Sequence, residues 1–249
     1  MGVKVVSWRL HSLLGDAVCS FHCSDVDRLI DSMGSHDASR YSVANLREAV
    51  KLIKSRYGDK GLCYFVLHHY LDRFVDILVS VLSKFYERYA FGGIELDQVY
   101  REVRNEVGIR LSIDPKNILS LLVNDLEKVR MALHLLYGRN SRKRFDSILQ
   151  NAYQEIQRCR ELQELRNTVE FVLGAIESSI DCIIYAVLRD ETFRSSTMDK
   201  IGNAICVKIA REMYRGYTYT YESLSDRNKL TTFIDTVLRE AYSNCQKLK

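Results

Sequence analysis

The chain has 249 residues, of which 47% are apolar, and a formal net charge of +4. The apolar fraction excludes general disorder, and the small net charge excludes a broadly basic protein, so any nucleic-acid site has to be a local patch. One Pro and 12 Gly over this length favour an all-helical protein.

Four helices are predicted in the N-terminal part of the chain, after an ambiguous start that fits either a strand or a helix. They cover residues 24–33, 43–57, 62–91 and 96–107. Ser24 is the N-cap of the first helix, and glycines end the other three, as Gly58, Gly92-Gly93 and Gly108. The helix over 62–91 is apolar on most sides, which is typical of a largely buried helix.

Four more segments are predicted to be helical in the C-terminal part. They cover residues 114–137, 142–189, 196–214 and about 226–245. Asp114-Pro115 is an N-cap followed by Pro at the first helical position, and Ser196 with Asp199 resembles a capping box. Between the last two helices, Tyr217–Tyr221 alternates Tyr and Thr, which is a strand-like pattern.

The segment 142–189 is predicted to be a central helix on which the others pack. Thirteen apolar residues from Phe145 to Val187 recur with a mean spacing of 3.5 residues, the heptad period. One helix over this range would be about 70 Å long, although the polar stretch 160–167 leaves room for a break. A helix of this length favours self-association.

The predicted fold class is therefore all-α, a multi-helix bundle of about eight helices around one long central helix, with room for a short lone strand or hairpin. Gly108–Asp114 is the best candidate boundary between an N-terminal helical lobe, 1–110, and a C-terminal lobe, 111–249. One continuous domain is the alternative.

A basic turn precedes the predicted central helix and is the first candidate site. Cations at the start of a helix oppose the helix dipole, so an anionic partner such as a phosphate backbone would explain them. The alternative is that they cap the preceding helix or lie in solvent. The predicted nucleic-acid contacts are Arg139, Arg142, Lys143 and Arg144 in this turn, with Arg211 and Arg215 further along the chain.

The segment 211–221 interleaves Tyr with Arg and is the second candidate site. Tyr and Arg are enriched in interface hot spots, and aromatic residues beside Arg also stack on single-stranded bases. A lone strand here would need a partner, such as Val3–Val6 or another chain. An ordinary surface loop is the alternative. The predicted interface tyrosines are Tyr214, Tyr217, Tyr219 and Tyr221.

A stripe of small residues on the predicted central helix is the third candidate, because small side chains let another helix approach closely. The stripe consists of Gly174, Ser178, Cys182 and Ala186. The approaching helix could belong to the same chain or to a second copy.

No metal site, catalytic residue or cofactor is predicted. Cys19, His22 and Cys23 lack the second close pair that a zinc site needs. His36-Asp37 is similar to the dipeptide of metal-dependent His-Asp phosphohydrolases, but it lies in a polar loop. His68, His69 and Asp72 are expected to form local pairs one turn apart. The seven Cys are expected to be reduced core thiols, with a disulfide as the alternative.

The favoured function is a non-enzymatic, self-associating structural or assembly protein, nucleoprotein- or capsid-like in its most concrete form. The sequence has no phosphate-binding Gly-rich loop, nucleophile elbow or His-Glu-x-x-His motif, which disfavours the common enzyme classes. The expected partners are a second copy and a nucleic acid, without a small-molecule substrate, and the expected location is the cytoplasm or a viral particle. A helical protein-binding adaptor or regulator is the alternative, followed by a His-Asp phosphohydrolase using His36 and Asp37.

Overall fold

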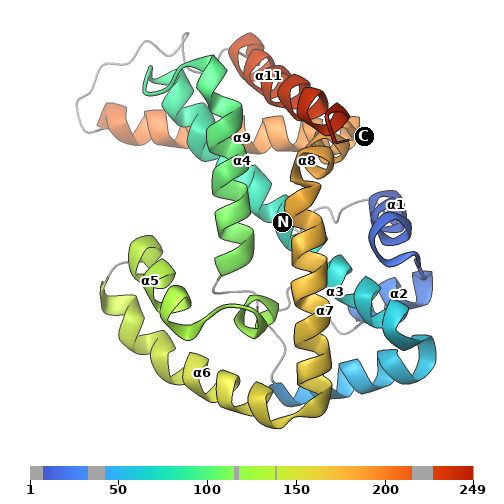
Figure 1. Ribbon diagram of the computed structural model, residues 1–249. Coiled ribbons are helices and arrows are strands. Elements are labelled where there is room, and N and C mark those ends of the chain that lie inside the picture. The colour runs from blue at the N-terminus through green and yellow to red at the C-terminus, as the bar shows by residue number, and fades with distance from the viewer. Residues whose placement is uncertain (1–7, 33–42, 115–117, 138, 215–226, 249) are drawn as a thin grey trace. The chain divides into compact units, whose positions relative to one another are not determined.

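The computed structural model describes residues 8–32, 43–114, 118–137, 139–214 and 227–248 (Figure 1). These residues form α1 (Trp8–Cys19), α2 (Ser24–Ser32), α3 (Val43–Ala90), α4 (Leu96–Ile113), η2 (Ile118–Leu122), α5 (Leu126–Tyr137), α6 (Arg139–Arg158), α7 (Arg160–Ser178), α8 (Ile180–Arg189), α9 (Glu191–Tyr214) and α11 (Arg227–Gln246). The all-α prediction is confirmed. The predicted strand over 217–221 and its candidate partner Val3–Val6 lie outside the described residues.

The chain folds into two compact units, each of which takes segments from both halves of the sequence. Of the described residues, unit 1 takes those in Val75–Gly108 and Ser179–Lys249, and unit 2 takes those in Val5–Phe74 and Ile109–Ser178. The predicted boundary near Gly108 is one place where the chain passes between the units. The units themselves do not follow the predicted split into 1–110 and 111–249.

The predicted central helix over 142–189 is wrong as a single helix. It is divided into α6, α7 and α8, with breaks at Cys159 and Ser179. The long helix is α3 instead, which is kinked at Gly58, where φ is 66° and ψ is −158°. Every residue of the α3 segment 61–71 is buried, as predicted for an apolar helix.

Three predicted helix ends also differ from the structure. The helix over 96–107 continues past Gly108 to Ile113, since Gly is tolerated inside a helix at a modest cost. The helix predicted from Asp114 begins at Leu126, where the Asp125 carboxylate accepts the Glu127 amide at 2.8 Å. The helix predicted from Ser196 begins at Glu191, because Asp190 caps it by accepting the Phe193 amide at 2.8 Å.

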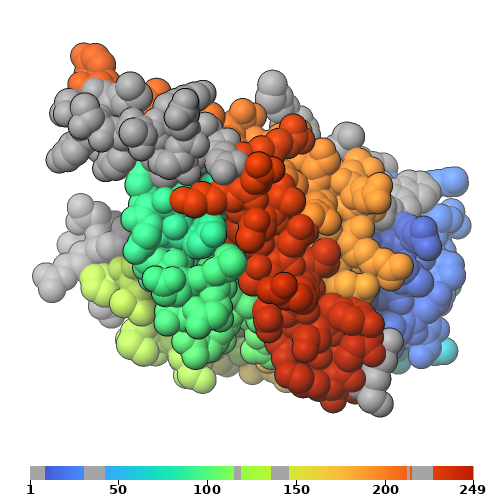
Figure 2. Space-filling model, turned by 90° about the horizontal axis from the view of Figure 1, so that it is seen from above, coloured from blue at the N-terminus to red at the C-terminus, as the bar shows by residue number. Residues whose placement is uncertain are grey.

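The core of unit 1 forms where α11 packs along α8, with α9 against both. Figure 2 shows α11 in red beside the orange α8–α9 segment. The predicted apolar face of the last helix is buried, namely Leu230, Phe233, Val237, Ala241 and Cys245. Cys245 forms a disulfide with Cys182 of α8.

In unit 2, α1 packs against α3 along three successive turns. The His11 and His68 rings lie 4.1 Å apart between centroids, and Cys19 forms a disulfide with Cys63. Between them, a Cβ on Gly15 would lie 2.5 Å from the Tyr64 ring, so only Gly fits this position. The expectation of reduced thiols is therefore wrong for four of the cysteines, and Cys23, Cys159 and Cys206 are unpaired.

No single helix among the described residues has the length and apolar character needed to span a membrane. In the part of the chain that the structure describes, α7 and α8 taken together, across the break between them, are the one pair that passes such a test of length and composition.

Candidate functional site

Helix α9 has two faces, one of which has no cover among the described residues. Its buried face recurs every four residues, at Thr197, Ile201, Ile205 and Ile209. At about 100° per residue, the opposite side of the helix carries Val207, Ala210, Arg211 and Tyr214. These four residues are exposed and are called the α9 stripe below.

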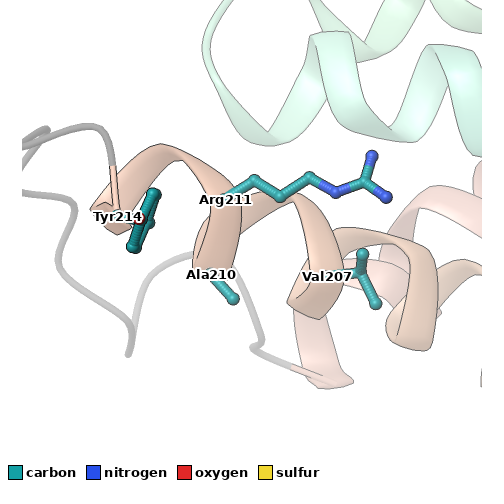
Figure 3. Close-up of a pocket in the computed structure, with 4 residues that line it drawn as sticks. All are labelled: Val207, Ala210, Arg211 and Tyr214. Atoms are coloured by element: carbon teal, nitrogen blue, oxygen red, sulfur yellow. The ribbon is translucent and has the colours of Figure 1, made fainter.

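The α9 stripe lines an open hollow of about 560 Å³ (Figure 3). Val207 is 52% exposed and Tyr214 is 95% exposed. Arg211 extends back along the helix, away from Tyr214 (Figure 3). An apolar stripe with one aromatic and one Arg residue has the composition of an interface centre.

Two residues of the predicted Tyr-Arg segment, Arg211 and Tyr214, thus lie together on one exposed helix face. The remaining predicted residues of this segment lie outside the described residues, namely Arg215, Tyr217, Tyr219 and Tyr221. Sequence reasoning missed Val207 and Ala210. Val207 lies four residues before Arg211 and seven before Tyr214, and Ala210 lies four before Tyr214, which are helical spacings.

The predicted basic turn is helical, since α6 begins at Arg139. The first turn of α6 has no acidic residue. The backbone of Arg139, Arg142, Lys143 and Arg144 therefore occupies the first two turns of α6. Their side chains lie outside the described residues.

The predicted stripe of small residues does not lie on one helix. Gly174 and Ser178 are exposed residues of α7, whereas Cys182 and Ala186 are half-buried residues of α8. Cys182 is bonded to Cys245, so at this position the stripe meets α11 of the same chain.

A second candidate site is a buried cluster of His and Asp residues in unit 2. His68 of α3 lies between two carboxylates: its Nδ1 is 2.8 Å from Asp27 Oδ1 and its Nε2 is 3.2 Å from Asp72 Oδ2. His11 Nε2 of α1 is 3.4 Å from the other oxygen of Asp72. The Tyr64 hydroxyl donates to both oxygens of Asp27, at 2.9 and 3.1 Å.

Electrostatics in this cluster favour the charged forms of His68 and Asp72. Burial lowers the pKa of His68, but the hydrogen bond to Asp27 and the charge of the adjacent Asp72 and Asp27 carboxylates outweigh it and raise the pKa to about 9. Burial raises the pKa of Asp72, but the imidazoles of His11 and His68 beside it outweigh this effect and hold the pKa well below its usual range. Burial and the hydrogen bond to Asp27 raise the pKa of Tyr64.

Several polar atoms of this cluster are buried without a hydrogen-bond partner. They are both ring nitrogens of His11, Nε2 of His68 and Oδ2 of Asp72. The 3.2 and 3.4 Å separations from Asp72 therefore lack the alignment of hydrogen bonds. Buried polar atoms in this state are rare in folded proteins and call for an explanation.

The sequence predicted the local pairing of His68 with Asp72 but not its connection to His11 or Asp27. His36 and Asp37 lie outside the described residues. His22 is exposed and pairs with Asp16 at 2.8 Å.

Comparison with known proteins finds no family model, no curated protein and no solved structure that matches this chain.

Proposed function

We propose that the protein is a non-enzymatic structural or assembly protein that self-associates, and that the α9 stripe is the contact between two copies. The observation that carries this proposal is the α9 stripe, in which Val207, Ala210 and Tyr214 are exposed opposite the core-facing side in the last turns of α9. Exposed apolar patches of this kind mark interaction sites more often than isolated exposed residues do.

The stripe is self-complementary, which favours a second copy as the partner. A two-fold axis between positions 210 and 211 would place two α9 helices antiparallel. Tyr214 would then oppose the smaller Val207 of the other copy, and Arg211 would oppose the small Ala210. Pairing long side chains with short ones allows close helix packing, and an isologous contact of this type is the commonest in homo-oligomers.

Charge is also compatible with this pairing. The two Arg211 side chains would not lie directly opposite each other, and each could reach the Tyr214 ring of the other copy. An Arg on an aromatic face is a favourable contact when partly desolvated.

Light scattering on a sizing column over a range of protein concentrations tests this proposal. The wild type is expected to form a dimer or larger oligomer, and Val207→Glu and Tyr214→Ala are each expected to shift it towards the monomer. Leu135→Glu is the matched control, because Leu135 of α5 is 83% exposed and belongs to the other compact unit.

A wild type that stays monomeric at high concentration would contradict the proposal and leave the adaptor alternative. Dissociation by Leu135→Glu but not by Val207→Glu would move the contact to the exposed apolar residues of α5 and α6, which include Met131 and Ile148.

Nucleic-acid binding is a second candidate function, favoured by the start of α6. Four basic residues place positive charge within the first two turns, where it is unfavourable next to the positive end of the helix dipole. No acidic residue in the first turn compensates this charge. Binding of a labelled oligonucleotide should weaken steeply as salt rises and should fall in the Arg142→Ala/Lys143→Ala variant. Binding that is unchanged in this variant would remove the role of α6.

A further inference from the structure

We propose that His11, His68 and Asp72 form a binding site for a divalent transition-metal ion such as Zn²⁺. The site lies inside unit 2, where α1 meets α3, and it is independent of the α9 stripe in unit 1. Each residue offers one ligand atom, and these atoms all lie within 4.8 Å of one another.

The orphaned polar atoms of the cluster point to a ligand. His11 is fully buried, and neither of its ring nitrogens has a hydrogen-bond partner. Nε2 of His68 and Oδ2 of Asp72 are in the same state. A metal ion that displaces the proton from Nε2 of His68 would be bound by one nitrogen of each imidazole and by the carboxylate together, because all three then supply a lone pair.

The separations between these atoms suit a small coordination sphere. A tetrahedral zinc site with bonds of about 2.0–2.1 Å has edges of about 3.3 Å. Oδ1 of Asp72 lies 3.4 Å from Nε2 of His11, and Oδ2 of Asp72 lies 3.2 Å from Nε2 of His68. The three ligand atoms lie within 4.8 Å of one another, so a rotation of the Asp72 carboxylate with small rotations of the two rings would bring both nitrogens and one carboxylate oxygen onto one ion.

The surroundings of His68 already resemble the outer shell of a metal site. Its Nδ1 contacts Asp27 at 2.8 Å, and a carboxylate that accepts this proton leaves Nε2 as the ligand atom. Asp27 is held in turn by the Tyr64 hydroxyl. Carboxylate–histidine–metal chains of this form fix the ring orientation and increase metal affinity.

Packing holds the two helices in register at the site. Gly15 of α1 lets the Tyr64 ring lie against the helix backbone, and the disulfide between Cys19 and Cys63 joins the same helices. His11 is thus positioned over His68 by two contacts that do not depend on the metal. A preorganised site of this kind loses less entropy on binding.

The donor set also indicates the class of metal. Two imidazoles with one carboxylate suit zinc and neighbouring first-row ions, whereas magnesium and calcium prefer oxygen ligands. Metal binding releases the second proton of His68, and a divalent ion then balances the charge of Asp27 and Asp72 with both imidazoles as neutral ligands. Unpaired charge is costly in a buried cluster, so this balance favours a divalent over a monovalent cation.

The test uses the untagged full-length protein with its disulfides intact, stripped with a chelator and titrated with Zn²⁺. Calorimetry and elemental analysis after gel filtration are expected to give one zinc per chain. At a free zinc concentration 100 times Kd, the melting temperature is expected to rise by about 5–10 °C. The same concentration of Mg²⁺ should leave it unchanged.

Three variants and one matched control locate the ion. His11→Gln and Asp72→Asn are each expected to weaken zinc binding by about 100-fold or more, and Asp27→Asn by about 10-fold through the outer shell. His22→Gln is the control, because His22 is an exposed histidine outside the cluster. The zinc affinity of this variant should equal that of the wild type. Circular dichroism shows which variants fold.

Several outcomes would overturn the proposal. They are a wild type that binds no zinc or is equally stabilised by Mg²⁺, folded variants that keep full affinity, or an equal loss in His22→Gln. If His11→Gln and Asp72→Asn both fail to fold, the zinc stoichiometry of the wild type and the zinc affinity of Asp27→Asn still test the proposal. With Co²⁺ in place of zinc, a thiolate charge-transfer band would place the metal on a free cysteine and refute the assignment, and its absence supports it.

Discussion

Cys19 of α1 is bonded to Cys63 of α3 across 44 residues of sequence, five residues before His68 on the same helix. This link closes a loop that contains all of α2 and the first turns of α3. A cross-link of this span stabilises a protein mainly by restricting the unfolded chain. It also ties α1, which carries His11, to the helix that carries His68.

The Cys19→Ser/Cys63→Ser double variant is expected to lower the free energy of unfolding by about 2–4 kcal/mol. Urea unfolding under non-reducing conditions measures the difference. Cys23→Ser is the control, since Cys23 is unpaired and half-buried, and it should cost much less. Thiol titration of the unfolded wild type should find three free thiols, and seven would contradict both disulfides.

Asp181 of α8 holds Tyr100 and Arg104 of α4 in unit 1. It accepts from the Tyr100 hydroxyl, and the Arg104 Nε lies 3.0 and 3.3 Å from its two oxygens. Asp181 is buried, whereas Arg104 is 41% exposed. Loss of the carboxylate would therefore leave one buried hydroxyl and one guanidinium without their acceptor.

Asp181→Ala is expected to lower the free energy of unfolding by about 2–4 kcal/mol. Arg104→Ala is expected to cost about 1 kcal/mol or less, because solvent already screens the guanidinium, and Tyr100→Phe about 1 kcal/mol. Chemical denaturation of the three variants checks this order. A loss in Arg104→Ala equal to that in Asp181→Ala would contradict it.

The 3.5-residue spacing predicted burial well but helix continuity badly. Most of its described positions are buried, from Ala152 in α6 to Val187 in α8, although Ile148 is 57% exposed. The spacing of buried residues continues across the breaks because each short helix buries its apolar face. The break at Cys159 depends on local bonds that hydrophobic spacing does not report, such as its amide to the Ile156 carbonyl at 3.4 Å.

The buried cluster could be predicted only in part, for a related reason. His68 and Asp72 are four residues apart, so helix geometry alone places them together. His11 and Asp27 come from other helices, and nothing local in the sequence couples residue 11 to residue 68. The signal on α1 is the four-residue spacing of His11, Gly15 and Cys19, which marks its buried face but not its partner.

Glu161, in the first turn of α7, stabilises the fold by an amount that changes with pH in the acid range. A hydrogen bond from the Cys159 thiol, 3.0 Å from Oε2, acts with its backbone amide, Arg47 and Lys51 to lower the pKa of Glu161 to about 2. Because this pKa lies below the ordinary 4.5, the stabilisation is present above about pH 4.5 and is lost as the pH falls through about 2.

The wild type should therefore be more stable than Glu161→Gln at pH 5, and the difference should shrink as the pH falls from 4.5 to 2. Urea midpoints of both proteins across this range measure it. Glu155→Gln, which removes an exposed carboxylate of α6, gives the baseline. A difference that stays constant with pH would contradict the lowered pKa of Glu161.

Gly58 and Gly174 should respond to alanine with opposite signs, although a Cβ at either position would meet no atom within 4 Å. Gly58 has φ 66° and ψ −158° at the kink of α3, a backbone conformation that costs other residues about 1–3 kcal/mol. Gly174 lies exposed inside α7, where Ala should stabilise by about 0.5–1 kcal/mol because it restricts the unfolded chain and favours helix.

Urea unfolding of Gly58→Ala and Gly174→Ala in one buffer checks this contrast. A neutral Gly58→Ala would mean that α3 is not kinked at this residue. Gly174→Ala also tests the predicted stripe of small residues, because a second helix packed closely on Gly174 would leave no room for a methyl group. If Gly174→Ala destabilises the protein, or if this variant no longer forms oligomers in light scattering, α7 is a helix-packing contact in addition to the α9 stripe.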